Sequence, residues 1–336
     1  MLAVNQREIV KWFPGSPATF HASTHHATFP FQGVPKATQN FPDLTTRLYQ
    51  TDAFPCAIGE QSDLFRARGV NDEKGKVLAL KTLRTGSSSN PTFFQELQQR
   101  LVALGDGWAR LVHENIAPIY GVAYGCGRLP AIVMNYYPGS LISCMEQRHY
   151  SNEEKMNWVK EIASGMKYLH RQRLPVVHGD LRGSNIFLDA TGRCQIADVG
   201  MVYLTHSPEF VAMQSAKTCR WTAPELMDPR APTPTTPGPE CTTRSDVFSF
   251  AMTVVEIFSE NPPFKQNKND TSVIFLIVKG ERPELPQFVQ ESPILSKLIP
   301  ACWAQEPFKR PTISYVCWKL GVTSNFRYVL EWVNLI

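Results

Sequence analysis

Apolar side chains recur along this chain at two spacings, one typical of β-strands and one typical of α-helices. Residues 77–81 alternate so that Ala79 and Lys81 share one face of a predicted strand. Residues 131–133 form a second short apolar strand. Helical spacing begins after Asn90-Pro91, an N-cap with a first-turn proline, and returns twice further along the chain. The apolar positions of these three predicted helices are Phe94, Leu97, Leu101 and Leu104; Trp158, Ile162, Met166 and Leu169; and Phe248, Met252, Val255 and Phe258.

The third predicted helix, which begins near Ser245, is apolar on all sides. Such a helix belongs in a protein core. Ser249, Thr253 and Glu256 interrupt its apolar stretch, which is also shorter than the ~20 residues that a bilayer requires. The sequence therefore predicts a buried helix and no membrane span.

Two acids and an amide between the second and third helices suit phosphoryl transfer. Residues 178–185 read HGDLRGSN, and Asp198-Val199-Gly200 follows Asn185 after thirteen positions. Phosphoryl transfer needs a carboxylate that orients and deprotonates the attacking hydroxyl, and magnesium that neutralises phosphate charge. Asp180 suits the first task. Asn185 and Asp198 offer the oxygen ligands that Mg²⁺ prefers, so we predict that they hold the metal.

The HGDLRGSN and DVG segments resemble the catalytic loop and metal-binding motif of eukaryotic protein kinases. The resemblance runs from about residue 57 to residue 320 in the family's order. Residues 220–225, RWTAPE, resemble the end of a kinase activation segment, which would start at Asp198. Residues 245–252 resemble the start of the family's buried central helix. Arg310 matches the late arginine that pairs with Glu225 in the family, which implies a structural ion pair.

This resemblance implies an α+β, bilobal protein-kinase-like fold. The N-lobe would be small and β-rich, and the C-lobe larger and mainly α-helical. We expect an extended or disordered leader, a kinase domain and a C-terminal tail, with a second irregular segment at 229–239. The expected bounds are 1–43 for the leader, 44–320 for the domain, 321–336 for the tail, and, within the domain, 44–134 for the N-lobe, 135–140 for the hinge and 141–320 for the C-lobe.

The resemblance also implies a role for each matching residue. Asp180 would orient the substrate hydroxyl, Arg182 would steady the transferred phosphate, and Lys81 would pair the phosphates of ATP. Glu96, the only acid on its helix before the end, is expected to form a salt bridge with Lys81. The expected nucleotide-binding residues are Gly59, Leu64, Ala79, Lys81, Met134 as the gatekeeper, and Asn135 and Tyr137 through their backbones.

The expected phosphate-binding loop departs from the family's pattern. Residues 57–64 keep one glycine, Gly59, where the family often has three, so fewer backbone amides can approach phosphate closely. Glu60 adds a negative charge that would repel phosphate if it pointed inward. Both features weaken the predicted affinity for nucleotide.

Three further departures bear on activity. Gly179 replaces the arginine that binds a phosphorylated activation loop in many kinases, so we hypothesise that activity does not require that phosphorylation. Val199 replaces a phenylalanine, and at roughly 25 cal/mol per Å² the active arrangement would lose on the order of 1 kcal/mol of packing. Ala251 for glycine within a helix is a mild change. His178 is predicted to be a hydrogen-bonded core residue and not a base.

Two other functions remain open at this stage. Small-molecule phosphotransferases of the aminoglycoside and choline kinase type carry a similar HGD loop, but the APE-like segment, Asp246 and Arg310 favour a protein substrate. A pseudokinase that binds partners without transferring phosphate is favoured by the poor glycine loop and by Val199. Five retained residues argue against it: Lys81, Glu96, Asp180, Asn185 and Asp198.

The acceptor hydroxyl is predicted from a few positions. Thr218 resembles the threonine of tyrosine-kinase-like serine/threonine kinases, whereas Arg182 and residues 221–225 also occur in tyrosine kinases. Serine and threonine are therefore favoured, with dual specificity open. HGDLRGSN together with RWTAPE and SDVFSFAM looks most like the expanded tyrosine-kinase-like set of mushroom-forming fungi, which would place the protein in signalling.

Composition agrees with one bilobal catalytic unit. The chain has 336 residues, 43% of them hydrophobic, enough for a full core. A net charge of +4 spread among acids does not predict a nucleic-acid partner, so the expected partners are ATP and a protein substrate. Eight cysteines without a C-x-x-C pair indicate reduced thiols, and we predict a cytoplasmic location with the nucleus as an alternative.

Overall fold

The computed structural model describes seven stretches of the chain. They are residues 41–59, 62–70, 75–84, 91–127, 129–205, 216–228 and 241–322. Most of the expected leader and tail, Glu60 of the expected phosphate loop and the irregular segment at 229–239 lie outside these stretches.

A curled antiparallel sheet forms the first part of the fold. Its strands lie in the order β1-β3-β4-β6-β5, with β2 paired to β3. The register places Lys81 of β4 opposite Leu64 of β3 and Ile132 of β6. The bounds are β1 Leu48–Gln50, β2 Ala57–Ile58, β3 Ser62–Gly69, β4 Leu78–Leu83, β5 Ile119–Ala123 and β6 Ala131–Asn135, with a short 3₁₀ turn, η2, at Thr45–Arg47 before β1.

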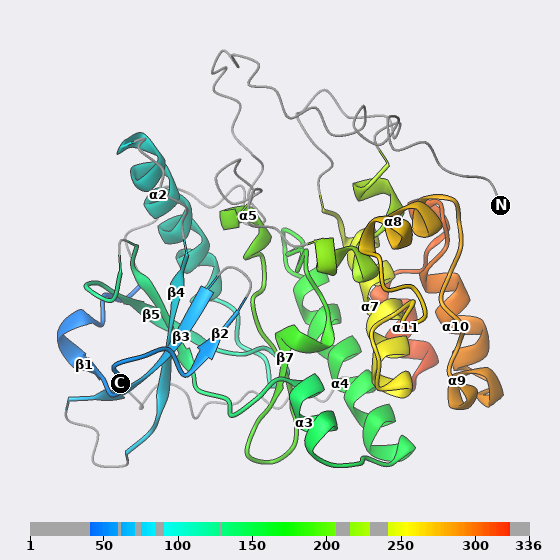
Figure 1. Ribbon diagram of the computed structural model, residues 1–336, viewed down its shortest axis with the longest axis horizontal. Helices are drawn as coiled ribbons and strands as arrows, with labels where there is room; N and C mark the ends of the chain where they lie inside the picture. The colour runs from blue at the N-terminus through cyan, green and yellow to red at the C-terminus, as the bar shows by residue number, and fades with distance from the viewer. Residues whose placement is uncertain are drawn as a thin grey trace.

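Helix α2, Pro91–Trp108, lies against this sheet (Figure 1). The helix packs by one apolar face, since its buried side chains recur every three or four residues. These are Phe93, Leu97, Leu101, Leu104 and Trp108. Phe93 therefore takes the fully buried place that the sequence pattern gave to Phe94, which is only partly buried.

The remainder of the described chain is mainly helical. Two long helices, α4 and α7, begin with capping boxes: Ser151 with Glu154, and Thr242 with Ser245. The bounds are α3 Leu141–Gln147, α4 Asn152–His170, η3 Gly183–Asn185, β7 Ile186–Leu188, β8 Cys194–Ile196, α5 Val202–Thr205, η4 Ala216–Trp221, η5 Pro224–Leu226, α7 Thr243–Ser259, α8 Asp270–Val278, α9 Gln287–Glu291, α10 Leu295–Cys302, η6 Pro307–Lys309 and α11 Ile313–Lys319.

Helix α7 is the centre of this helical part. Every residue from Ser245 to Ile257 is buried, as expected for a helix that is apolar on all sides. Trp158, Ile162, Met166 and Leu169 of α4 belong to the same core cluster. A core of this kind gives the loops around it a rigid support.

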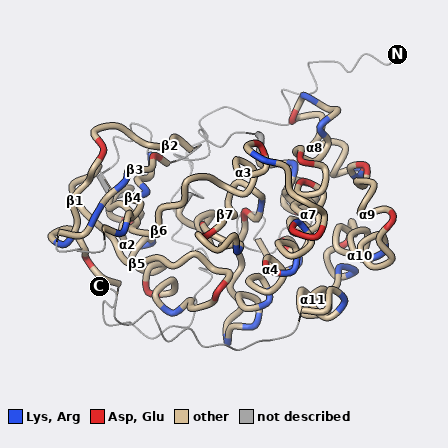
Figure 2. The backbone as a smooth tube through the Cα atoms, turned by 90° about the horizontal axis from the view of Figure 1, so that it is seen from below, with Lys and Arg blue, Asp and Glu red and all other residues tan. Residues whose placement is uncertain are grey.

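The bilobal α+β fold is confirmed. Figures 1 and 2 separate the sheet with α2 from the helical part in two perpendicular views. The chain passes between the two parts after β6 ends at Asn135 and before α3 begins at Leu141. Figure 2 also shows basic and acidic residues interspersed over both parts. No helix within the described residues is long and apolar enough to cross a membrane.

The expected ion pair between Glu225 and Arg310 is present and mostly buried. Both terminal nitrogens of Arg310 donate to the Glu225 carboxylate at 2.6 Å, and the arginine side chain has no exposed surface. Its other donors reach the backbone carbonyls of Ala304, Arg244 and Gln305. The pair therefore fastens the segment that ends with η5 to the last helices of the fold.

Removing the carboxylate should leave the buried arginine charge without its partner. We expect Glu225→Ala to lower the free energy of unfolding by about 3 kcal/mol, as for other buried ion pairs that lose one member. Urea denaturation measures the change. Glu306→Ala is the matched control, because it breaks the exposed pair with Lys309 and should cost less than about 0.5 kcal/mol. Equal losses in the two variants would contradict a structural role for the buried pair.

Candidate active site

The loop that carries Asp180 is held in place through its backbone. The buried carboxylate of Asp246 in α7 accepts the backbone N–H groups of His178 and Gly179, each at 2.9 Å. The same carboxylate bonds the ring of His170 at 2.8 Å. A loop without regular secondary structure thereby gains a fixed position on the central helix.

His178 itself is a buried positioning group. Its Nε2 lies 2.8 Å from the carbonyl oxygen of Ala197, which can only accept, so Nε2 carries the proton. Its Nδ1 then accepts the backbone N–H of Asp180 at 3.1 Å. The prediction that His178 is a hydrogen-bonded core residue is confirmed.

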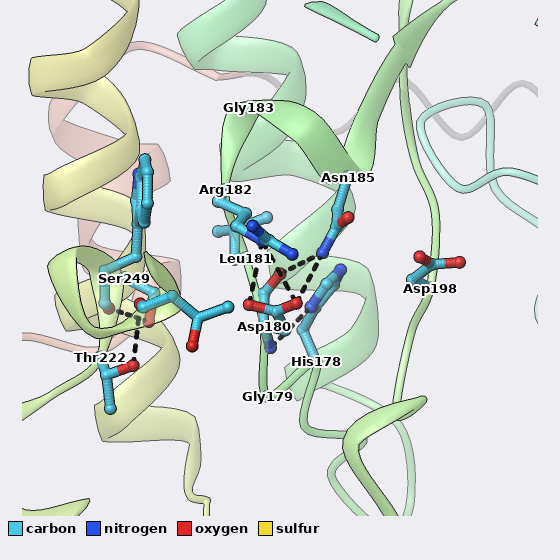
Figure 3. Close-up of polar contacts among 12 residues, drawn as sticks. His178, Gly179, Asp180, Leu181, Arg182, Gly183, Asn185, Asp198, Thr222 and Ser249 are labelled. Atoms are coloured by element: carbon cyan, nitrogen blue, oxygen red, sulfur yellow. Dashed lines mark hydrogen bonds and ion pairs between the residues drawn. The ribbon is translucent and has the colours of Figure 1, made fainter. Parts of the chain in front are cut away.

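The Asp180 carboxylate is oriented by two neighbours (Figure 3). The side-chain amide of Asn185 donates to its Oδ2 at 2.9 Å and to its backbone carbonyl at 2.8 Å. The Arg182 guanidinium lies 3.3 Å away. Burial raises the pKa of Asp180, while Arg182, His178 and Asn185 act in the opposite direction. A third of the side chain remains exposed, at 32%, so the carboxylate can still meet a hydroxyl.

Asn185 and Asp198 are suited to Mg²⁺. Because the amide nitrogen of Asn185 is bonded to Asp180, its amide oxygen is free to face the other way, and Figure 3 shows it on the side of Asp198. Asn185 and the strand before Asp198 are also tied together, since the Ala197 N–H donates to the Asn185 carbonyl at 2.9 Å. One amide and one carboxylate oxygen match the protein share of a magnesium site that keeps water and phosphate ligands.

Lys81 pairs with Asp198 across the two lobes. Its ammonium group bonds the Asp198 Oδ2, and both side chains are mostly buried. Asp198 has a left-handed backbone, with φ at 61°. The lysine that is expected to pair the phosphates and the expected metal ligand therefore lie together at the lobe junction.

The salt bridge between Glu96 and Lys81 that is expected in the assembled enzyme is not formed in this structure, where Lys81 pairs with Asp198. Glu96 is exposed and has no ionic partner among the described residues. The reason is its helical phase: Leu97 points into the core, and Glu96, one residue earlier, is turned about 100° away from that face. Leu104 and Trp108 occupy the inward positions nearer the end of α2.

Four of the expected nucleotide-binding residues lie in one apolar cluster, together with a residue that the sequence pattern does not single out. Ala79, Met134 and Tyr137 are buried in one apolar cluster, and Leu64 packs against it. Phe187 of β7 joins them and stacks on Tyr137, with ring centroids 5.0 Å apart and planes 20° from parallel. Phe187 could have been predicted from its position, because it lies two residues after Asn185 on the strand that follows the catalytic loop.

Gly59 directly follows β2, and Asn135 is the last residue of β6. The Gly59 N–H donates to the Ser62 carbonyl at 2.8 Å in the turn between β2 and β3. The Asn135 side chain accepts the Tyr120 hydroxyl at 2.7 Å, and that hydroxyl accepts from Lys76 at 2.8 Å. Because its side chain is used in this chain of bonds, Asn135 can contribute its backbone to a ligand without losing its orientation.

Gly179 occupies a position that only glycine fits. Its φ is 84°, in the left-handed region, and a Cβ built there would lie 2.5 Å from Cγ1 of Val202. The space that an arginine would need is filled by the start of α5. The packing around residue 179 therefore excludes the arginine that the family usually carries here.

Glu256 of α7 supports the far end of the catalytic loop. One of its oxygens accepts the Gly183 N–H at 2.8 Å and the Trp221 indole N–H at 3.0 Å. Burial raises its pKa to about 7, against the opposing effect of these two bonds and of Arg182. From the sequence, Glu256 is recognisable only as a polar interruption of an apolar helix.

Comparison with known proteins agrees with this geometry. The family model described as protein tyrosine and serine/threonine kinase matches residues 58–320. The RGS domain-containing serine/threonine-protein kinase A of Dictyostelium discoideum is 30% identical over 241 residues, or 71% of this chain. The matched stretch is 20% of that relative, so the chain spans about a fifth of its length.

The raised pKa of Glu256 predicts a pH-dependent stability. Between its ordinary pKa of 4.5 and the folded value of about 7, the unfolded chain releases this proton more readily, so the folded state loses stability as pH rises. We expect Glu256→Gln, which cannot ionise, to gain on the order of 2 kcal/mol relative to the native chain between pH 5.5 and pH 8. Urea denaturation of both proteins at the two pH values measures this gain. Parallel stability curves for the two proteins would contradict the assignment.

Proposed function

Since the chain belongs to the protein tyrosine and serine/threonine kinase family, we propose that it transfers the γ-phosphoryl group of ATP to serine and threonine hydroxyls of protein substrates. The observation that carries this proposal is the grouping of Asp180, Asn185, Asp198 and Lys81 at the junction of the two lobes. Each is a residue type that phosphoryl transfer uses, and each is oriented by a bond to a neighbour.

In the proposed reaction, Asp180 accepts the proton of the attacking hydroxyl and keeps its oxygen in line with the γ-phosphorus. Arg182 balances negative charge beside it. Asn185 and Asp198 would hold Mg²⁺, which would supply positive charge to neutralise the phosphates. Lys81 would exchange its bond to Asp198 for the α- and β-phosphates of ATP. Leu64, Ala79 and Phe187 would enclose the adenine between the lobes.

Serine and threonine as acceptors are supported by Thr218 and by the printed name of the Dictyostelium relative. The further proposals follow from sequence resemblance: a tyrosine-kinase-like subtype of the kind expanded in mushroom-forming fungi, a role in signalling, and a cytoplasmic or nuclear location. The domain limits of 44–320, with a hinge at 135–140, belong to the same proposal.

Phosphate transfer to a mixed peptide library tests the proposed function. With labelled ATP and Mg²⁺, we expect transfer to serine and threonine peptides, and we expect Asp180→Ala to lower kcat by at least about 10³-fold because the hydroxyl loses its base. Asp189→Ala is the control, since Asp189 caps a turn outside the catalytic loop and should leave kcat within about twofold. Transfer to choline or aminoglycosides alone, or no transfer by folded protein, would overturn the proposal.

The packing at Gly179 predicts how activity responds to dephosphorylation. Without an arginine at this position, no side chain from residue 179 can bind a phosphate on the activation segment. We therefore expect phosphatase treatment to leave kcat unchanged within about twofold, measured on the same peptides. A loss of activity after phosphatase treatment that is recovered on rephosphorylation would contradict this prediction.

A further inference from the structure

Trp108, the last residue of α2, reaches from the N-lobe to the turn that carries Asp198. Its indole N–H donates to the backbone carbonyl of Val199 at 2.8 Å. Both residues are only 3% exposed, so water does not compete for this bond. The other buried side chains of α2 are apolar and have no N–H to offer. Trp108 therefore gives this helix a polar contact with the residue beside the expected metal ligand.

The turn at Asp198 needs such support. A left-handed backbone costs an L-residue of order 1 kcal/mol or more, and it persists where its surroundings hold it. The Gly200 N–H donates to the His178 carbonyl at 3.0 Å, and the Met201 N–H donates to the Asp198 carbonyl at 3.1 Å. The bond from Trp108 satisfies the carbonyl between these two. Each peptide group of the turn is thus fixed, and with it the direction of the Asp198 side chain.

The bond from Trp108 reaches the main chain at position 199 and not its side chain. Val199 occupies the position where the family usually carries phenylalanine. Its side chain belongs to the core cluster of the helical part, whereas Trp108 belongs to the cluster on the inner face of α2. The hydrogen bond therefore links α2 to the backbone beside Asp198 independently of the size of the side chain at position 199.

The indole is itself held from its outer side. The ring of Phe41 lies against it, with centroids 6.1 Å apart. Phe41 also packs so closely on Gly105 that a Cβ there would come within 2.2 Å of its ring. The next residue, Pro42, accepts the Val122 N–H at 2.9 Å and so ties this segment to β5. Trp108 is therefore confined between the N-terminal edge of the fold and the Asp198 turn.

We propose that Trp108 is a positioning residue that sets the orientation of Asp198 through the Val199 carbonyl. This inference rests on the proposed function, in which Asp198 holds Mg²⁺. It adds a residue of α2 to the active site of the kinase. It also makes the position of α2 a determinant of metal binding, through a bond that does not involve Glu96.

Trp108→Phe tests the bond, because it keeps an aromatic ring and removes the N–H. The matched control is Trp158→Phe: Trp158 is 4% exposed, and its indole donates to the Gly192 carbonyl at 3.3 Å within the C-lobe. Both variants should lower the melting temperature. Only Trp108→Phe should lower kcat, by on the order of tenfold, and raise the Mg²⁺ concentration at half-maximal rate severalfold. The peptide KM should change by less than about twofold in both variants.

Equal kinetics in the two phenylalanine variants would show that Trp108 is merely structural and would overturn the proposal.

Failure of the proposed function is distinguishable from failure of this inference. If the native chain transfers no phosphate to any acceptor, the function is wrong, and calorimetry of ATP binding with and without Mg²⁺ then decides the inference. A weaker Mg²⁺ dependence in Trp108→Phe than in Trp158→Phe supports the positioning role. The same Mg²⁺ dependence in both variants overturns it.

Discussion

The carboxylate of Asp246 carries a buried negative charge around which the catalytic loop is built. Burial alone would raise the pKa of this group, but His170 and the loop's own backbone outweigh it, and the pKa lies below its ordinary value. The charge is therefore retained in the core and remains available to the N–H groups of His178 and Gly179. Since α7 is buried along most of its length, the loop takes its position from the most rigid element of the fold.

A second carboxylate on the same helix holds the other end of the loop. Glu256 accepts the Gly183 N–H, so carboxylates of α7 form hydrogen bonds with the loop backbone both before and after Asp180. The two carboxylates are ten residues apart, or roughly 15 Å along the helix, which spans the loop. Their pKa values are shifted in opposite directions, because the bonds from His170 and from the loop backbone outweigh burial at Asp246, whereas burial dominates at Glu256. The two anchors of one loop therefore differ in charge near neutral pH.

Sequence alone predicted those parts of the site that depend on short segments. Asp180, Asn185 and Asp198 lie within twenty residues, and the ion pair of Glu225 with Arg310 was implied by the resemblance to protein kinases. Glu96, the expected partner of Lys81, points outward in this structure, as the inward position of its neighbour Leu97 implies.

Other parts of the site depend on the tertiary structure. Trp108, Phe187 and Val202 act through contacts with residues far away in the chain or on another element. Hydrophobic spacing assigns such residues to the core, but it does not show which neighbour they touch there.

The segment from Arg220 to Glu225 is fastened mainly by residues that come later in the chain. Arg220 is bonded to Asp270 and to the carbonyls of Pro263, Phe264 and Asn267, and Glu225 is bonded to Arg310. Protein chains emerge from the ribosome with the N-terminal end first. The loop with Asp180 and the proposed metal ligands are therefore synthesised before Arg310, which completes the fastening of the segment at 220–225. A nascent chain cannot fasten this segment fully until translation has passed residue 310.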